Sequence, residues 1–353
     1  MKLFESFKIR KIVGLLKSGN LIVIPTETVY GIIGNAFDQN VYRHLNKIKR
    51  RPEKKQYTLF VKDLNTVREY ACFNYKYTKL LEKMVPGPLT FIMEGRGLPE
   101  HIYTKNKSIA FRIPDHNIIR TIMQKIDFPL LSTSANISTE NIPNNLNGIK
   151  KVFKSDIAYY MKGAIRNKEP STVIDIRNKL IIERRGPYKV SDFLKYHKPI
   201  YLRDRLHILF VCYANIVRSP IAEAYFKSNT GYEIRSSGVH ASNIDTPPEE
   251  AQSVAIENNI DVSNHKSNKL TYKDLNWADI VITMDNMVKS DIYDMFNYNS
   301  QIWLTSSFSK KLNGELIPDP FGYKKEAYHK MMKELLYHLN ELKMYLDMNI
   351  VRV

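Results

Sequence analysis

The sequence predicts an α/β protein with two domains. Its 353 residues exceed one typical domain and are enough for two hydrophobic cores. Each half contains a short apolar run followed by a turn, at residues 21–24 and at residues 208–211, as expected of a buried strand. The charge is also divided unevenly: residues 1–200 hold 36 Lys and Arg against 17 Asp and Glu, whereas the remainder has a net charge of −2. We therefore expect a strongly basic first domain, suited to anionic ligands, and a nearly neutral second domain.

The second half contains a motif with specific chemistry at residues 212–219, Cys-Tyr-Ala-Asn-Ile-Val-Arg-Ser. It follows the apolar run and leads into a helix-like stretch that begins with Pro220. Backbone N–H groups at such a turn and the helix dipole favour an oxyanion, which Arg218 can hold through two parallel hydrogen bonds. The same positive field lowers the pKa of Cys212, so this motif predicts a phosphate cradle with a thiolate nucleophile. Asp319, on a Pro-flanked loop, is the candidate acid.

Together these residues resemble the low-molecular-weight protein tyrosine phosphatase family, over about residues 207–346. The resemblance implies a doubly wound, mainly parallel sheet for this domain. It also implies a cysteine-dependent phosphomonoesterase that acts on a phosphoprotein. The implied roles are nucleophile for Cys212, phosphoryl-oxygen ligand for Arg218, acid and later base for Asp319, loop shaping for Asn215 and thiolate stabilisation for Ser219.

Two positions in the loop bear on substrate and activity. Ile216 favours phosphotyrosine, because relatives with threonine there favour phosphoarginine, yet residues 319–322 (Asp-Pro-Phe-Gly) also resemble the arginine-phosphatase branch. Ala214 stands where the family usually has glycine, and it costs about 1 kcal/mol if the position requires a positive φ. Phosphotyrosine hydrolysis is the prediction, with phosphoarginine hydrolysis or an inactive domain as the alternatives.

The first half carries a series of separated motifs. An amphipathic helix precedes the strand at residues 21–24, which leads into a turn rich in hydroxyl groups at residues 25–31, Pro-Thr-Glu-Thr-Val-Tyr-Gly. A cationic run follows at residues 49–55. The later motifs are residues 86–90, 110–114, 132–136, 170–175 and 184–186. In this order they closely resemble the YrdC-like threonylcarbamoyl-AMP synthases, over roughly residues 5–190.

That resemblance implies a twisted, largely mixed sheet with flanking helices. It implies synthesis of threonylcarbamoyl-AMP from ATP, bicarbonate and L-threonine, with partner proteins that use the product to modify tRNA. The implied ATP-binding residues are Lys49, Arg51, Lys55, Ser134, Asn136 and Arg184, and the implied threonine-binding residues are Thr28, Arg112 and Ser171. Mg²⁺ is expected to arrive with ATP, since no acidic cluster resembles a metal site. The alternative is a YrdC-like fold kept as an RNA-binding or regulatory module.

The expected boundaries are residues 1–190 for the first domain and 206–353 for the second. Residues 191–205 are expected to form the linker, because they are polar, charged and interrupted by Pro199. No apolar run approaches the roughly 18 residues of a membrane helix, and no signal-peptide pattern is present. With two cysteines, Cys72 and Cys212, a disulfide framework is excluded and a cytoplasmic location is expected.

Overall fold

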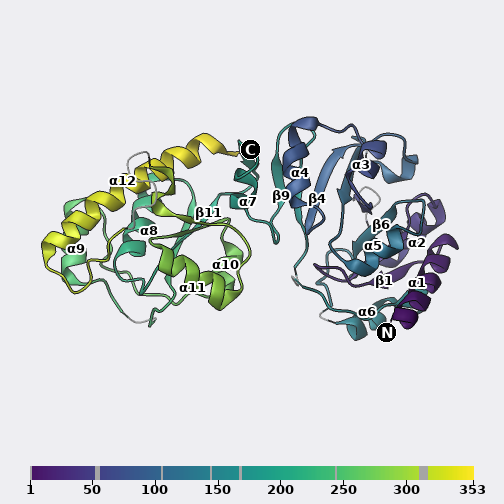
Figure 1. The fold of residues 1–353 in the computed structure, drawn as a ribbon, viewed down its shortest axis with the longest axis horizontal. Helices are drawn as coiled ribbons and strands as arrows, with labels where there is room; N and C mark the ends of the chain where they lie inside the picture. Colours follow the sequence, from purple (N-terminus) through teal and green to yellow (C-terminus); the bar gives the residue numbers. More distant parts are fainter. Residues whose placement is uncertain are drawn as a thin grey trace. The chain divides into compact units, whose positions relative to one another are not determined.

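The chain forms two compact units, Met1–Tyr188 and Lys189–Val353 (Figure 1). The computed structural model describes residues 2–51, 56–104, 106–143, 145–166, 169–242, 245–309 and 317–353. Both units combine β-sheet with helices, which confirms the predicted α/β class. Within the described ranges, no helix has the length and apolar character needed to cross a lipid bilayer.

The first unit is built around a mixed sheet. Its strands are β1 (Ile22–Ile24), β2 (Gly31–Asn35), β3 (Thr58–Phe60), β4 (Leu89–Glu94), β5 (Ser108–Arg112), β6 (Leu130–Ser134), β7 (Tyr159–Tyr160), β8 (Thr172–Asp175) and β9 (Ile181–Arg184). They lie in the order β9-β8-β4-β5-β3-β6-β2-β1-β7. The β3–β5, β4–β8 and β1–β7 pairs are parallel, and the β1–β2, β2–β6, β3–β6, β4–β5 and β8–β9 pairs are antiparallel. The predicted mixed sheet is therefore confirmed.

Helices flank this sheet. They are α1 (Lys2–Lys17), α2 (Gln39–Lys49), α3 (Leu64–Tyr70), α4 (Thr78–Met84), α5 (Asn117–Met123) and α6 (Leu146–Phe153). Ile12 and Leu16 of α1 lie one turn apart on the same face and pack in one hydrophobic cluster with Ile119 and Ile122 of α5. Residues of β1, β2 and β6 complete this cluster, so α1 and α5 are held against that part of the sheet.

The second unit contains a parallel sheet covered by helices on both faces. Its strands β11 (His207–Cys212), β12 (Glu233–Gly238), β13 (Ile280–Thr283) and β14 (Ile302–Leu304) lie in the order β12-β11-β13-β14. The helices are α7 (Val190–Leu194), α8 (Arg218–Asn229), α9 (Glu249–Glu257), α10 (Tyr272–Trp277), α11 (Asn286–Phe296) and α12 (Lys325–Asn349).

Alternating side chains of β11 explain why both faces are covered. Leu209 and Val211 pack in a cluster with Val288 of α11, whereas the ring of Phe210 lies 5.1 Å from that of Phe226 in α8. Because β11 lies between β12 and β13, the chain changes direction there, which is the usual place for a ligand site in a doubly wound sheet. The predicted parallel-sheet domain is confirmed.

The segment expected to be a linker has a different structure. Residues 191–205 include most of α7 and the strand β10 (Ile200–Leu202), which pairs in parallel with β15 (Ile350–Arg352). The Ser191 hydroxyl donates to the Gln301 carbonyl oxygen at 3.2 Å, and the Gln301 amide donates to Asp192 at 3.0 Å. The polar side chains that suggested a linker therefore form hydrogen bonds within the second unit.

Candidate functional site

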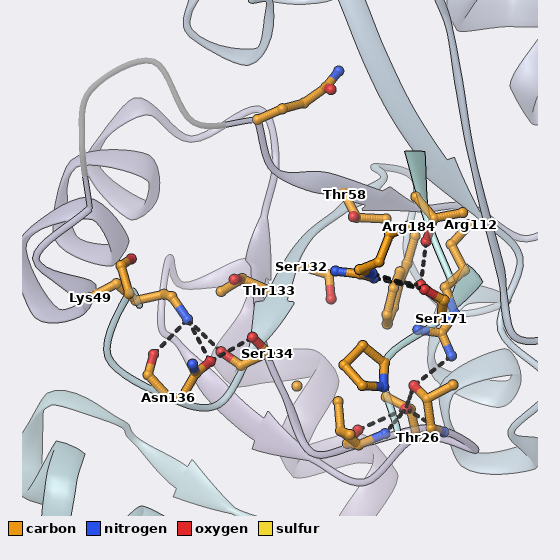
Figure 2. A pocket seen from close by; sticks show the side chains of 18 of the residues that line it. Thr26, Lys49, Thr58, Arg112, Ser132, Thr133, Ser134, Asn136, Ser171 and Arg184 are labelled. Carbon is orange, nitrogen blue, oxygen red and sulfur yellow. Dashed lines mark hydrogen bonds between the residues drawn. The ribbon is translucent and has the colours of Figure 1, made fainter. Parts of the chain in front are cut away.

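A polar cavity of about 220 Å³ opens in the first unit (Figure 2). The turn after β1, the end of α2, and residues of β3, β5 and β6 contribute to its wall. The structure brings together here the predicted residues Thr28, Lys49, Arg51, Arg112, Ser134, Asn136, Ser171 and Arg184. Predicted Lys55 lies outside the described residues. Every charged side chain among the described lining residues is a cation, so the cavity suits an anionic ligand.

The hydroxyl-rich turn positions Arg112. The Thr26 hydroxyl accepts from the backbone amides of Thr28 and Val29, at 3.0 and 3.2 Å, which fixes the turn. Arg112 Nη2 donates to the Thr28 hydroxyl at 2.8 Å and to Glu27 Oε1 at 2.7 Å. Glu27 and Arg112 are 2% and 5% exposed, so the ion pair is buried. Glu27 is not among the site residues assigned from the sequence, although it lies inside the motif at residues 25–31.

A second guanidinium lines the same cavity. Arg184 Nη2 donates to the Ser171 carbonyl oxygen at 2.8 Å, and the Ser171 hydroxyl lies 2.7 Å from that of Thr90. Burial lowers the pKa of Arg184, and the nearby positive charge of Arg112 lowers it further. A bound anion would relieve this repulsion, so the paired guanidinium groups favour a carboxylate or phosphate between them.

Lys49 is buried and hydrogen-bonded to the backbone, although it belongs to a cationic run in the sequence. Its side chain is 1% exposed, and Nζ donates to the carbonyl oxygens of Ser134 and Asn136 at 2.5 and 2.6 Å. Figure 2 shows these bonds converging on the turn that carries both polar residues. Lys49 is one of the residues expected to bind ATP, and it lines the cavity. In the structure its ammonium group binds backbone carbonyls and holds the Ser134–Asn136 turn in place.

Two contacts hold the guanidinium group of Arg51 in place. Nη2 donates to the Gln56 carbonyl oxygen, and the guanidinium lies 4.1 Å from the ring centroid of Tyr57. Burial lowers the pKa of Arg51. A partly desolvated guanidinium that is fixed on an aromatic ring is well suited to bind a phosphate oxygen.

The second candidate site lies at the carboxyl end of β11. Cys212 is the last residue of that strand and is 3% exposed. Its Sγ lies 2.9 Å from the Ser219 hydroxyl, and the Asn215 amide donates to it at 3.3 Å. The helix α8 begins at Arg218, so its N-terminus faces the loop. The Ser219 hydroxyl and the backbone amide of Asn215 therefore lie where they can donate to the sulfur, in the loop that the motif predicts.

Asn215 rather than Ala214 adopts the unusual backbone conformation of this loop. Asn215 has φ 58°, whereas Ala214 is not among the residues with positive φ in the described chain. The strain expected at Ala214 is therefore absent, because the position does not require glycine. The Asn215 side chain also donates to the hydroxyls of Ser219 and Ser236, at 2.9 and 2.8 Å, and so fixes the loop.

Arg218 joins three parts of the second unit. Nη1 donates to Asp285 at 2.9 Å and to the Ile317 carbonyl oxygen at 3.1 Å, and Nη2 donates to Asp319 at 2.5 Å. The predicted acid therefore lies beside the predicted phosphate ligand, although 101 residues separate them. Asp285, which caps α11, is not among the residues assigned from the sequence. It lies two residues after the end of β13, which is a signal of a loop residue at the edge of the sheet.

Gly238 allows the loop to lie against the end of β12. A Cβ at this position would lie 2.7 Å from the carbonyl carbon of Ala214, the amide nitrogen of Asn215 and the carbonyl oxygen of Tyr213. All three are backbone atoms that cannot move independently. The close approach therefore requires glycine, for a steric reason.

Residues 14–186 match the family model for Sua5, YciO and YrdC, which is described as telomere recombination. A putative threonylcarbamoyl-AMP synthase of Methanocaldococcus jannaschii is 35% identical over 182 residues, which are 50% of this chain and 86% of that protein. The chain belongs to the Sua5/YciO/YrdC family. The uncharacterized protein YciO of Escherichia coli strain K12 is 27% identical over 193 residues, 53% of this chain and 92% of that protein.

A second family model matches the C-terminal part of the chain. Residues 207–351 match the family model of low molecular weight phosphotyrosine protein phosphatases. The chain is thus a fusion of a YrdC-like domain with a phosphatase-like domain, which confirms the predicted recognition. A crystal structure of Pyrococcus abyssi Sua5 complexed with L-threonine has a TM-score of 0.53 and 19% identity, and covers 98% of this chain and 96% of that chain. This last likeness is one of fold alone.

Proposed function

We propose that the YrdC-like domain makes threonylcarbamoyl-AMP from ATP, bicarbonate and L-threonine. The observation that carries the proposal is the all-cationic charged lining of the 220 Å³ cavity, combined with its rows of serine and threonine hydroxyls. A nucleoside triphosphate and an amino-acid carboxylate both need cationic partners in a confined site. The putative synthase of M. jannaschii supports this assignment.

We assign the residues to two groups, as the family resemblance implies. Arg112, fixed by Thr28, and Ser171 hold threonine, with Arg112 on the carboxylate. Arg51 and Arg184 bind the phosphates, while Ser134 and Asn136 offer neutral hydrogen-bonding groups. In the reaction, the threonine amine and bicarbonate form N-carboxythreonine with loss of water. An oxygen of this carbamate group then bonds to the α-phosphorus as the bond to pyrophosphate breaks. The cations stabilise the charge that develops on the phosphate oxygens.

Mg²⁺ would enter as part of the nucleotide. The described lining residues offer cations and neutral hydroxyls but no carboxylate, so they suit a metal that the triphosphate itself holds. The product would pass to partner proteins that modify tRNA. We place both reactions of this chain in the cytoplasm, where the Cys212 thiol stays reduced.

The test is release of pyrophosphate that depends on all three substrates. We expect Arg112→Lys to raise the KM for threonine about tenfold or more and to change the KM for ATP little, because lysine loses the planar donor pair. Arg120→Lys, on the exposed side of α5, is the matched control. Equal increases in both constants would place Arg112 outside the threonine subsite, and no substrate-dependent pyrophosphate would refute the synthase proposal.

We further propose that the second domain hydrolyses phosphotyrosine in proteins. The observation that supports it is the placement of Cys212, Arg218 and Asp319 around one loop. Cys212 attacks phosphorus, Arg218 binds the phosphoryl oxygens, and Asp319 protonates the leaving oxygen and then activates water for hydrolysis of the phosphocysteine. Ile216 favours phosphotyrosine, and phosphoarginine is the second candidate because of residues 319–322.

Peptides that carry phosphotyrosine or phosphoarginine test this choice under reducing conditions. Cys212→Ser should eliminate turnover, whereas Cys72→Ser, at the exposed cysteine, should not. Asp319→Ala should slow hydrolysis roughly 10²- to 10⁴-fold, less for a substrate with a good leaving group. Faster hydrolysis of phosphoarginine would reverse the substrate assignment, and no turnover of either peptide would indicate an inactive domain.

A further inference from the structure

The phosphatase loop has an exposed aromatic ring directly beside its nucleophile. Tyr213 follows Cys212 in the chain and is 43% exposed, whereas Cys212 is 3% exposed. The sulfur therefore lies at the floor of the loop and the tyrosine ring lies at its outer edge. A substrate that brings its phosphorus to Cys212 must pass close to this ring.

Two residues from other parts of the second unit hold the ring of Tyr213 in place. The ring centroids of Tyr213 and His240 are 4.5 Å apart at an interplanar angle of 34°, and the His240 amide donates to the Tyr213 carbonyl oxygen at 2.9 Å. His240 Nε2 lies 3.2 Å from Asp291 Oδ2. Because an ionised carboxylate can only accept, we place the hydrogen on Nε2, which donates to Asp291. The orientation of the tyrosine ring is thus restrained before a ligand arrives.

These contacts place the ring on the side of the loop that faces α11. Asp291 belongs to α11, and the cap of the same helix, Asp285, accepts from Arg218 at 2.9 Å. One helix therefore holds the residue that binds the phosphoryl oxygens and, through His240, the exposed ring. The group attached to a phosphoryl bound at Arg218 leaves the loop beside Tyr213.

We propose that Tyr213 selects substrates with an aromatic leaving group, and that His240 and Asp291 are positioning residues for its ring. The inference rests on the phosphatase activity proposed above and names the part of that site that recognises the tyrosine ring of the substrate. The donors of the phosphate loop contact phosphoryl oxygens, which all phosphomonoesters share. An aromatic ring outside the loop adds a contact that a phenyl ring makes and a short aliphatic chain does not.

Binding to a full-length Cys212→Ser variant separates recognition from turnover. Calorimetric titration compares O-phospho-L-tyrosine with O-phospho-L-serine, which carries the same phosphate without the ring. We expect phosphotyrosine to bind about tenfold more tightly or better, and we expect Tyr213→Ala in this background to lose the preference at an unchanged affinity for phosphoserine. Tyr272→Ala, at a tyrosine of α10 that is 58% exposed, is the matched control and should keep the preference.

Conservative replacements in the same background test the two positioning residues. His240→Ala and Asp291→Ala should each weaken the preference for phosphotyrosine severalfold, because the ring of Tyr213 is then free to rotate. Asp291→Asn keeps an oxygen that accepts from His240, and His240→Phe keeps a ring that packs on Tyr213, so both should preserve the preference. A merely structural role would instead lower the affinity for phosphoserine and the unfolding temperature together.

Four results would overturn the proposal. They are the absence of binding by either ligand, equal affinity for both ligands in the parent, a preference retained in Tyr213→Ala, and equal weakening of both ligands in that variant. Tighter binding of phospho-L-arginine than of phosphotyrosine would also refute selection of an aromatic group. The wild-type chain is assayed with the phosphotyrosine peptide in parallel. Turnover without the ring preference refutes this inference alone, whereas the ring preference without turnover refutes the proposed activity alone.

Discussion

Lys49 illustrates how a cation can support the backbone of a site whose cavity it also lines. Its ammonium group binds carbonyl oxygens on both sides of Ala135, which keeps the hydroxyl of Ser134 and the amide of Asn136 toward the cavity. The Ser134 hydroxyl donates to Asn136 Oδ1 at 2.5 Å, so the two side chains also order each other. The geometry of this turn therefore depends on a residue 85 positions away in the sequence.

Replacing Lys49 should affect stability as well as activity. We expect Lys49→Ala to lower the free energy of unfolding by about 3 kcal/mol, because buried carbonyl groups lose a charged donor. Synthesis of threonylcarbamoyl-AMP should fall with it. Lys47→Ala, on the exposed face of the same helix, should change the unfolding free energy by less than about 0.5 kcal/mol. Urea denaturation measures both variants, and an unchanged midpoint for Lys49→Ala would show that the turn does not need its support.

Asn215, not Ala214, is the sensitive position of the phosphatase loop. We expect Ala214→Gly to lower the unfolding free energy by about 0.5–1 kcal/mol without raising activity, since glycine adds freedom to the unfolded chain and relieves no strain. Asn215→Ala should lower the unfolding free energy by a larger amount, because alanine tolerates positive φ poorly and loses the hydrogen bonds to Ser219 and Ser236. Thermal unfolding and phosphatase assays of both variants check this order. A gain of activity in Ala214→Gly would contradict it.

Sequence motifs located most of the residues in both candidate sites but not the contacts between residues that are distant in the sequence. Cys212, Arg218 and Ser219 lie within one loop, so local spacing was enough to assign them together. Glu27 and Asp285 were missed, because each acts through an arginine that is distant in the sequence. Local spacing carries no information about such contacts, and a buried glutamate in a hydroxyl-rich motif looks the same as an exposed one.

At the scale of elements, the end of β12 fixes the position of the phosphate loop. The β11–β12 register pairs Cys212 with Gly238, so the nucleophile and the glycine lie side by side. The amide of Val239 then donates to the Cys212 carbonyl oxygen at 3.2 Å, and that of His240 to Tyr213 at 2.9 Å. The loop is thus continuous with the edge of the sheet and has little freedom to move away.

A methyl group at Gly238 should disrupt this arrangement. We expect Gly238→Ala to lower phosphatase activity by at least about tenfold and to reduce the unfolding free energy by about 1–3 kcal/mol, as overpacking against fixed atoms does. Gly231→Ala is a matched control shortly before the same strand, where an added Cβ meets nothing within 4 Å. Activity and thermal unfolding are compared for the two variants. Equal activity and stability of the two variants would mean that the loop can move away from β12 without a cost in free energy.

At the scale of the whole molecule, the sequence predicted two α/β domains and both sheet types correctly. Ordered motifs were sufficient, because they lie at the ends of secondary-structure elements: residues 25–31 follow β1, residues 132–136 include the end of β6, and residues 212–219 join β11 to α8. The boundary between the two units was predicted less well. Residues 191–205 are rich in charge, and polarity alone does not distinguish an exposed linker from a segment whose polar groups are hydrogen-bonded. Val190, Phe193 and Leu194 are buried, and that short apolar group was the available signal.

The position of this boundary leads to a prediction about fragments that contain one unit each. We expect a fragment of residues 189–353 to be more stable than one of residues 206–353, because the shorter fragment lacks α7 and β10. It loses the bond from Lys189 Nζ to the Asn276 carbonyl oxygen, at 2.8 Å, and leaves β15 without its β10 partner. Thermal unfolding of the two fragments, at equal concentration, measures the difference, and phosphatase turnover reports whether each retains its loop. Residues 1–188, as the companion fragment, should retain the pyrophosphate-releasing reaction. If the shorter fragment unfolds at the same temperature as the longer one, residues 189–205 contribute nothing to the second unit and the linker interpretation of that segment is restored.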